Sequence, residues 1–442
     1  MDKMVKLKDY CTITKGKIGI KKAIKGNYPL VTTADERLSH NEHHFDKPSV
    51  IIPTVSSTGH GHASLKRIHY QEGKFAIGSI LCAVTPKDSN ILNANFLYHY
   101  LDTFKEELLV SKMKGMANVT LPIKLIGEVE FPLLTLEEQF NWVQLFNKTV
   151  QNTDKLLHEN ITQKSLIKKL RQSILQDAIS GKITEEWRKE NPELISGKNS
   201  AVSTLKKIKT EKERLIKEKK LKNQKPLPPI KDDEIPFDLP EEWVWTRLGC
   251  IANLISGYGF ESTDFTKNNG VKCIKITNAG VGKLTETDDT LPGKFVNRYS
   301  DYLVYTNDLV IALTRPYISD GLKICKCPQS YNNSLLNQRV AVIRNRNSAD
   351  NDYIYLYMNS MYVLKKYKAK FQGVSQQPNL KNKDLIELEF PLPSLREQKI
   401  IVAKVETLFE LCDQIEEQVN KSEEEAKLLM QSVLKEAFSG GK

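Results

Sequence analysis

The sequence predicts an α+β protein: two α/β globular domains joined by a pair of long antiparallel helices, a coiled coil, in a pseudo-two-fold tandem repeat. Two observations predict this fold. The segment Phe131–Gln139 returns as Phe390–Gln398, and Leu170–Gly181 returns as Leu429–Gly440, both at an offset of 259 residues. A chain of 442 residues, 40% of them hydrophobic, is also long enough for two or more hydrophobic cores.

Residues 1–134 and 239–393 are expected to form the globular domains. The N-terminal segments of the two domains correspond, because Leu7 and Gly16 match Leu248 and Gly257 at an offset of 241. The offset grows from 241 to 259, so the second domain carries about 18 extra residues. Runs rich in β-branched residues predict strands at 48–56, 75–85, 308–315 and 339–345, and longer periodic runs predict helices at 94–109 and 352–369.

Residues 135–182 and 394–442 are expected to be the long helices. Thr135 and Ser394, each followed three residues later by glutamate, predict capping boxes, and each segment ends in Ser-Gly, a typical helix stop. Apolar residues at three- and four-residue steps form a stripe that needs a partner. The residues expected to pair the helices or to dock partner proteins are Leu136, Val143, Val150, Leu157, Leu395, Val402, Phe409, Ala178 and Ala437.

The linker of residues 183–238 bears on how the helices pair. Chain order favours antiparallel pairing, with the globular domains at opposite ends. Parallel pairing would require the linker to run back along the whole helix, and its length does not exclude this. The basic run Lys206–Lys225 is expected to form a short solvated helix and Pro226–Ile230 an extended spacer. Contact with nucleic acid or a partner protein is the alternative for the basic run.

The net charge of +11 suggests a polyanionic partner. The excess is +5 over residues 1–134 and +4 over 239–393, whereas 394–442 carries −3. A polyanion would therefore prefer the two globular domains, as a duplex held at two points. Seven scattered cysteines, no apolar run long enough for a membrane and no secretory signal at the start predict a cytoplasmic protein.

Motifs that would indicate catalysis are missing from the sequence. It contains no phosphate-binding loop of the form G-x-x-x-x-G-K-[ST] and no Asn/Asp-Pro-Pro-aromatic motif of amino-methyltransferases. All eight histidines precede residue 159, and histidines can hold zinc or act as acid and base, but no H-E-x-x-H or Cys-x-x-Cys spacing accompanies them. No catalytic or metal-binding residue is expected. A histidine-dependent metal nuclease in residues 1–134 is the enzymatic alternative.

The repeat resembles the specificity subunit (HsdS) of type I restriction-modification systems. The resemblance is carried by Pro-Leu-x-x-Leu-x-Glu-Gln at Pro132–Gln139 and Pro391–Gln398, by Ala-x-Ser-Gly at both helix ends, and by the stretches Gln224–Gly249 and Gly373–Leu385. It implies that each globular domain is a target-recognition domain for one half of a bipartite, asymmetric DNA sequence. It also implies that the helix pair sets the gap between the halves.

The resemblance further implies partners and cofactors. The helices would dock two copies of the modification methyltransferase subunit (HsdM), and a restriction subunit (HsdR) can join. This chain would bind no cofactor itself, since S-adenosylmethionine, ATP and Mg²⁺ would belong to those partners. A DNA-bridging protein of the same architecture, without a methyltransferase partner, is the alternative function.

Side chains on loops of such domains would contact the DNA. Arg, Lys, Asn, Gln and hydroxyl side chains can hydrogen-bond to base edges in the major groove. The candidates lie on the loops 56–67 and 314–323 and near residue 376. They are Ser57, Thr58, His60, His62, Lys66, Arg67, Thr314, Arg315, Tyr317, Lys323, Ser375, Gln376 and Gln377.

Overall fold

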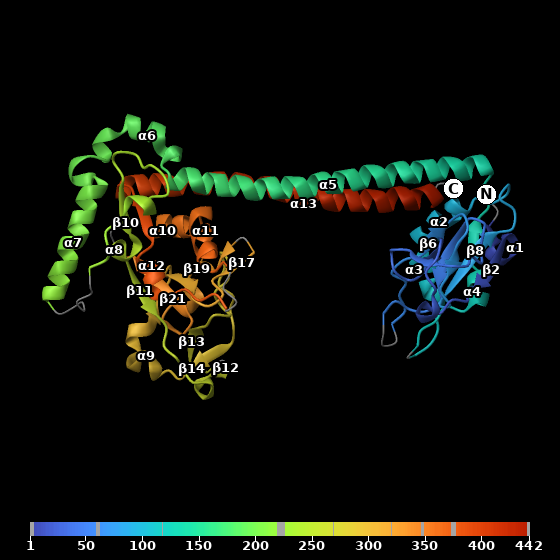
Figure 1. The fold of residues 1–442 in the computed structure, drawn as a ribbon, viewed down its shortest axis with the longest axis horizontal. Coiled ribbons are helices and arrows are strands. Elements are labelled where there is room, and N and C mark those ends of the chain that lie inside the picture. Colours follow the sequence, from blue (N-terminus) through green and yellow to red (C-terminus); the bar gives the residue numbers. More distant parts are fainter. Residues whose placement is uncertain are drawn as a thin grey trace. The chain divides into compact units, whose positions relative to one another are not determined.

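The computed structural model describes residues 4–58, 62–116, 118–218, 226–267, 269–319, 321–345, 349–372 and 377–439. The chain divides into two compact units, one of Met1–Gln163 with Gln418–Lys442 and one of Lys164–Glu417. Each unit holds one globular domain and part of each long helix (Figure 1). The predicted α+β architecture, with two globular domains joined by a long helix, is confirmed.

The first domain is built on the antiparallel sheet β2-β8-β5-β6. Its strands are β2 (Cys11–Lys15), β8 (Leu81–Pro86), β5 (Ser49–Pro53) and β6 (His69–Gln71). The further strands and the helices are β1 (Met4–Lys6), β3 (Tyr28–Val31), β4 (Leu38–His40), β7 (Ala76–Ile77), β9 (Glu130–Pro132), α1 (Leu7–Tyr10), α2 (Ala94–Thr103), α3 (Lys105–Leu108) and α4 (Ile123–Gly127). Val50, Val84, Leu97 and Phe131 are fully buried in its core.

The second domain repeats this plan on the sheet β11-β21-β16-β19. Its strands are β11 (Ala252–Ser256), β21 (Val340–Asn345), β16 (Leu309–Ala312) and β19 (Ile324–Lys326). A second sheet, β12-β14-β13-β20-β15, consists of β12 (Thr266–Lys267), β14 (Asp289–Leu291), β13 (Val271–Ile274), β20 (Ser334–Leu336) and β15 (Leu303–Val304). The remaining elements are β10 (Val244–Arg247), β17 (Tyr317–Ile318), β18 (Gly321–Leu322), β22 (Glu389–Leu392), α8 (Leu248–Ile251), α9 (Phe295–Arg298), α10 (Asn351–Met358), α11 (Met361–Lys370) and α12 (Asn382–Ile386).

Strand register shows that the two domains are copies. In the first domain Val84 of β8 pairs with Ile13 of β2 and with Val50 of β5. In the second, Ile343 of β21 pairs in the same way with Leu254 of β11 and Leu309 of β16. The offset is 241 at Ile13 and 259 at Val50 and Val84. The extra residues of the second domain therefore lie between β11 and β16.

The long helices are α5 (Leu136–Ile179) and α13 (Leu395–Ser439). Within the second unit they run antiparallel, because residue numbers rise along one as they fall along the other. Arg171 pairs with Asp413, whereas Lys404 reaches the carbonyl of Ile183, just beyond the end of α5. The predicted antiparallel pairing is confirmed there.

Buried residues recur along both helices at seven-residue steps, as in a coiled coil. They are Thr153, Asn160, Ile167 and Ile174 on α5, and Val405, Cys412, Val419 and Ala426 on α13. Thr153 and Asn160 are polar, so the apolar pattern of the sequence does not reveal them.

The predicted pairing residues fall into three groups. Ala178 and Val402 are buried. Val143, Val150, Leu157 and Phe409 are half-buried. Leu136 and Leu395 are each 38% exposed, so burial does not place them in the helix seam. The side chain of Ala437 lies outside the described part of the chain.

A buried glutamine fastens each long helix to its domain. Gln139 donates from Nε2 to the carbonyl of Leu134 (2.8 Å) and accepts at Oε1 from the backbone N–H of Asn93 (2.7 Å), the N-cap of α2. Gln398 accepts in the same way from the N–H of Asp350 (2.6 Å), the N-cap of α10. The two glutamines are fully buried, and their shared role explains why the glutamine returns in the repeat.

The helix termini meet the sequence expectations in part. Thr135 and Glu138 form the predicted capping box, with N–H···O distances of 2.8 and 3.3 Å. At Ser394 only half of the box forms: the Glu397 N–H donates to the Ser394 hydroxyl (3.2 Å), but the Glu397 carboxylate binds other partners. The reciprocal box predicted there is wrong. Gly181 ends α5 with a φ of 78°, as predicted, whereas Gly440 is outside the described residues.

The linker contains α6 (Glu185–Glu190) and α7 (Ala201–Lys217). Ala201 and Ile208 are buried, so one side of α7 packs rather than being solvated all round. The end of the predicted basic run, residues 219–225, is outside the described part. All seven cysteines are free thiols. Among the described residues, none of the helices is long and apolar enough to cross a bilayer.

Candidate nucleic-acid interface

Three segments of the second domain meet through backbone hydrogen bonds. The N–H of Leu313 donates to the carbonyl of Arg339, the N–H of Leu380 to Leu313, and the N–H of Arg315 to Pro378, each at 2.8 Å. We call residues 313–315, 337–339 and 378–380 the second frame. It brings the predicted loop 314–323 beside the segment that follows residue 376, two regions about 60 residues apart in sequence.

The first domain contains the same arrangement, residues 54–56, 78–80 and 119–121, which we call the first frame. Here the N–H of Thr54 donates to Ile80 (2.8 Å), that of Leu121 to Thr54 (2.9 Å) and that of Ser56 to Val119 (2.9 Å). Every donor and acceptor stands 259 residues before its counterpart. The bonding of the two frames is therefore the same.

The side chains that the two frames display are different. Ser56, Ser79, Ile80 and Thr120 in the first frame stand where the second has Arg315, Gln338, Arg339 and Asn379. All four second-frame side chains are exposed. One backbone scaffold thus carries hydroxyl and alkyl groups in one domain and guanidinium and amide groups in the other.

Two arginines of the second frame have an unusual backbone conformation. Arg315 has a φ of 48° and Arg339 a φ of 70°, in the left-handed region, which costs a non-glycine residue about 1–2 kcal/mol. Among the described residues of the first domain, only glycines have a positive φ. Strain of this kind concentrates at functional sites.

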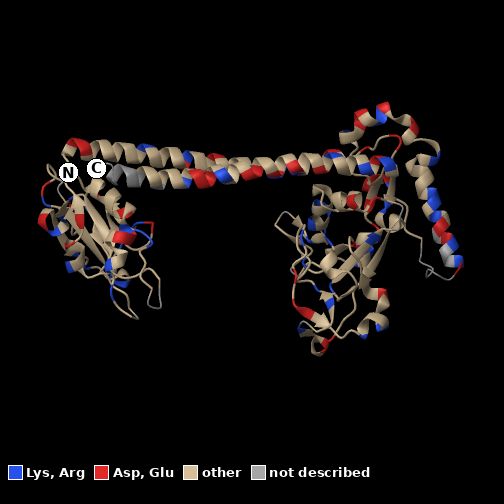
Figure 2. Ribbon diagram, turned by 180° about the vertical axis from the view of Figure 1, so that it is seen from behind, with Lys and Arg blue, Asp and Glu red and all other residues tan. Residues whose placement is uncertain are grey.

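The second frame carries positive charge. The pKa of Lys323 is lowered by its partial burial and next by the charge of Arg315. Within the described part of the chain, where Asp320 is missing, Arg315, Lys323 and Arg339 make no ion pair with a carboxylate. Basic residues are spread over both globular domains (Figure 2). Cations without an acidic partner suit the acceptors of a duplex.

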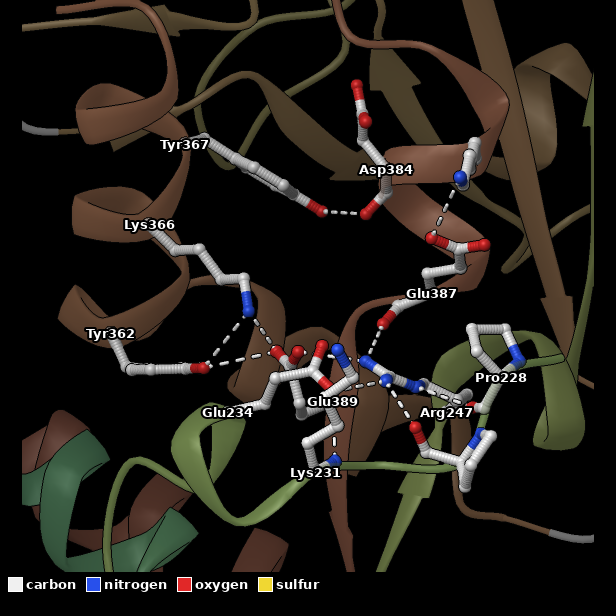
Figure 3. Close-up of polar contacts among 12 residues, drawn as sticks. Pro228, Lys231, Glu234, Arg247, Tyr362, Lys366, Tyr367, Asp384, Glu387 and Glu389 are labelled. Atoms are coloured by element: carbon white, nitrogen blue, oxygen red, sulfur yellow. Dashed lines mark hydrogen bonds and ion pairs between the residues drawn. The ribbon is translucent and has the colours of Figure 1, made fainter.

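A buried ion network holds the chain that follows the second frame (Figure 3). Arg247, whose side chain is 5% exposed, donates to the carboxylate of Glu389 (2.9 Å), the carbonyl of Glu387 (2.6 Å) and the carboxylate of Glu234 (2.7 Å). The hydrogen bond from Arg247 lowers the pKa of Glu234 to about 2. Arg247 is the last residue of β10, Glu387 follows α12 and Glu234 lies in the linker. The network therefore holds the chain after α12 and the end of the linker against β10.

The first-domain candidates divide into loop-bracing and exposed residues. The Ser57 hydroxyl donates to the Ser64 carbonyl (3.1 Å), and the Thr58 hydroxyl donates to the His62 carbonyl (3.2 Å), so both stabilise the loop. Arg67 pairs with Asp35 at 2.8 Å. Lys66 and the His62 side chain are exposed. His60 is outside the described residues.

In the second domain, Thr314 and Arg315 belong to the second frame. Gln377 lies directly before its third segment, residues 378–380. The carbonyl of Gln377 accepts from the Asn379 amide (3.2 Å). The ring of Tyr317 lies 5.9 Å from the ammonium of Lys368. Ser375 and Gln376 fall in the undescribed segment 373–376.

Sequence reasoning missed Gln338, Arg339 and Asn379. Arg339 opens a run whose pattern predicts only a strand, and nothing in the local sequence connects it with Arg315. The available signal was the offset of 259, which aligns Arg339 with Ile80 at the start of an equivalent strand.

Three of the eight histidines, His40, His69 and His99, are buried and contact neighbouring residues of the first domain or of α5. His40 Nδ1 lies 3.2 Å from the backbone of Ile24, His69 lies 3.3 Å from Arg37, and the His99 ring stacks on Phe146 at 3.6 Å. The described residues include no group of three His, Cys, Asp or Glu side chains that could hold a metal ion. The metal-nuclease alternative therefore gains no support from them.

Comparisons with known proteins agree with this picture. A family model described as "Type I restriction modification DNA specificity domain" matches residues 2–164 and 240–424. The chain is 35% identical over 257 residues to the EcoAI specificity subunit of a type I restriction enzyme from Escherichia coli, a match that spans 58% of this chain and 42% of that protein. It is 25% identical to the EcoDI specificity subunit from Escherichia coli, over 99% of this chain and 88% of that protein.

The fold also has solved counterparts. The HsdS subunit from Thermoanaerobacter tengcongensis matches with a TM-score of 0.57 at 17% identity, covering 100% of this chain and 97% of that one. At that identity the likeness shows a shared fold.

Proposed function

The chain belongs to the type I restriction-modification DNA specificity family, and from this premise we propose that it is the specificity subunit (HsdS) of a type I restriction-modification complex. Each globular domain would read one half of a bipartite, asymmetric DNA sequence. The observation that carries the proposal is the pair of frames, which share their backbone bonding and differ in the side chains they display. Different side chains on one scaffold are what two different half-sites require.

The helix pair would set the gap between the half-sites and dock partner subunits. Large apolar side chains remain exposed along both helices, and such surfaces on a soluble protein favour protein contacts. They are Phe140, Leu145, Leu156, Ile161, Leu166 and Leu170 on α5, and Leu411, Ile415, Leu428 and Leu429 on α13. We propose two copies of the modification subunit (HsdM) as the partners, with a restriction subunit (HsdR) as a further member.

The chain itself would supply the DNA address and no catalytic group. S-adenosylmethionine would be bound by the modification subunit, and ATP with Mg²⁺ by a restriction subunit. We propose a cytoplasmic location, because the complex would act on the DNA of its host cell.

The proposal is tested by mapping methylated adenines in the genome of the native host with and without this gene. Deletion should abolish methylation at one bipartite sequence and leave other methylated sites intact. An unchanged methylation pattern would contradict the proposal. If the full chain were then purified from the host and no methyltransferase purified with it, the DNA-bridging alternative would be favoured.

A further inference from the structure

The second frame displays two arginines on one bonded backbone unit. Arg339 accepts a hydrogen bond at its carbonyl from Leu313, and Arg315 follows Leu313 by two residues. Both side chains are exposed, and neither pairs with a carboxylate of the described residues. The main-chain bond from Leu313 to Arg339 therefore brings the backbone of the two arginines together on one frame.

The fold does not account for arginine at these positions. A left-handed backbone is adopted at no steric cost by glycine and at low cost by asparagine. Among the described residues neither guanidinium makes a hydrogen bond or an ion pair, and both side chains are exposed. Arginine at both sites therefore points to an external partner, because strained backbone is concentrated at functional sites.

We infer that Arg339, with Arg315, determines the base specificity of the second domain by donating paired hydrogen bonds to guanine in the major groove. The inference rests on the proposed function and adds the residue and the base. A guanidinium fork matches the O6 and N7 acceptors of guanine, and bidentate contacts of this kind are the commonest specific ones. The first frame has Ile80 and Ser56 at these positions and displays no arginine.

The experiment is a selection from a randomised duplex pool, with the full chain assembled with its modification subunit. The variants are Arg339→Lys, which keeps the charge but loses the fork, and Arg339→Gly, which suits a φ of 70° and so preserves the fold. Lys294→Ala is the matched control, because it removes an exposed charge of α9's N-cap, outside the frame.

The wild-type chain should select a bipartite sequence. In both Arg339 variants the preference for guanine should fall about tenfold at one position of one half-site, with the other half unchanged. Lys294→Ala should select the wild-type sequence. Replacement of that guanine by 7-deazaguanine should weaken wild-type binding by a similar factor and weaken Arg339→Lys little further, because the contact is already lost.

The possible failures are distinct. If the wild-type chain selects no bipartite sequence, the proposed function fails. If it does, but Arg339→Lys keeps the full guanine preference and Arg339→Gly weakens all sequences equally with a shallower salt dependence, Arg339 contacts phosphate and the inference is overturned. A lower melting temperature of Arg339→Gly together with unchanged selection by Arg339→Lys would assign Arg339 a structural role and overturn it too.

Discussion

The two long helices begin with the same motif in different surroundings. At the start of α5 the carboxylate of Glu138 is exposed and binds only Thr135 among the described residues. At the start of α13 the carboxylate of Glu397 is fully buried and accepts from Thr184 (2.7 Å), Arg188 (2.7 Å) and Trp243 (2.9 Å). The role of a repeated residue is therefore set by the residues that pack against it as well as by its place in the motif.

The end of α5 creates the second environment. Gly181 takes a left-handed conformation, and its carbonyl accepts from Arg188 at 2.7 Å. A Cβ atom at residue 181 would lie 2.7 Å from Pro240 and 3.1 Å from Trp243. The glycine therefore allows the chain to turn so closely that Arg188 and Trp243 both reach Glu397.

The largest effect of a single substitution should come from removing the buried carboxylate. Glu397→Ala leaves the guanidinium of Arg188, 10% exposed, without its ion pair. Loss of one partner of a buried ion pair lowers the free energy of unfolding by about 3–5 kcal/mol. Thermal denaturation of the full chain, with hydrogen exchange to identify which unit opens, measures the loss.

Glu138→Ala is the matched change in the other copy. Because its carboxylate is exposed, it should shift the melting temperature only slightly. Equal losses in the two variants would refute the idea that burial separates the two glutamates.

The next effect is expected from acid, which should lower the free energy of unfolding of the first unit more than that of the second. Burial lowers the pKa of His69 and His99 to about 4 from an ordinary 6.5, with Arg37 adding to the shift at His69. Between these values the unfolded chain binds protons that the native chain does not. The first unit is therefore most stable above pH 6.5, and each of the two histidines should contribute a loss of about 2–3 kcal/mol in the free energy of unfolding as the pH falls from 6.5 to 4.

The second unit provides the internal control, because all eight histidines precede residue 159. Hydrogen exchange at several pH values, resolved by unit, gives the measurement. His99→Leu should reduce the pH dependence of the first unit. Equal weakening of both units between pH 6.5 and 5 would count against this explanation.

A smaller and more symmetrical effect is expected at the two buried glutamines. Gln139→Ala and Gln398→Ala each leave a backbone N–H at a helix N-cap without its acceptor, at a cost of about 1–3 kcal/mol. Similar decreases in the two melting temperatures would show that this residue has the same role in both copies. A loss in only one copy would show that the repeated glutamine has diverged as the glutamates have.

Much of the fold could be predicted from local pattern. Helix periodicity and the 259-residue offset predicted α5 and α13, and the Ser-Gly pair predicted the left-handed Gly181. The prediction of a reciprocal capping box at Ser394 was wrong because the Glu397 carboxylate pairs with Arg188, which lies 209 residues earlier. Sequence spacing cannot reveal a competitor that arrives through tertiary packing.

The candidate site was accessible only in part for the same reason. The loops that hold Ser57 and Arg315 stood out by their polar composition, but their neighbours on the frame did not. Arg339 joins the second frame through a main-chain bond to Leu313, and Asn379 through a bridge to Thr314. The roles of the individual side chains stay predictions.

The bonding of the two frames has a consequence for how such a protein evolves. Every hydrogen bond that defines a frame joins main-chain atoms, so a new side chain at positions such as Ser79 or Gln338 removes none of them. If the frames read DNA as proposed, single substitutions at such positions would alter the DNA address of one domain and leave the main-chain bonds of the frame in place. At Arg315 and Arg339 the left-handed backbone narrows the accessible changes, since glycine and asparagine fit there more readily than branched residues.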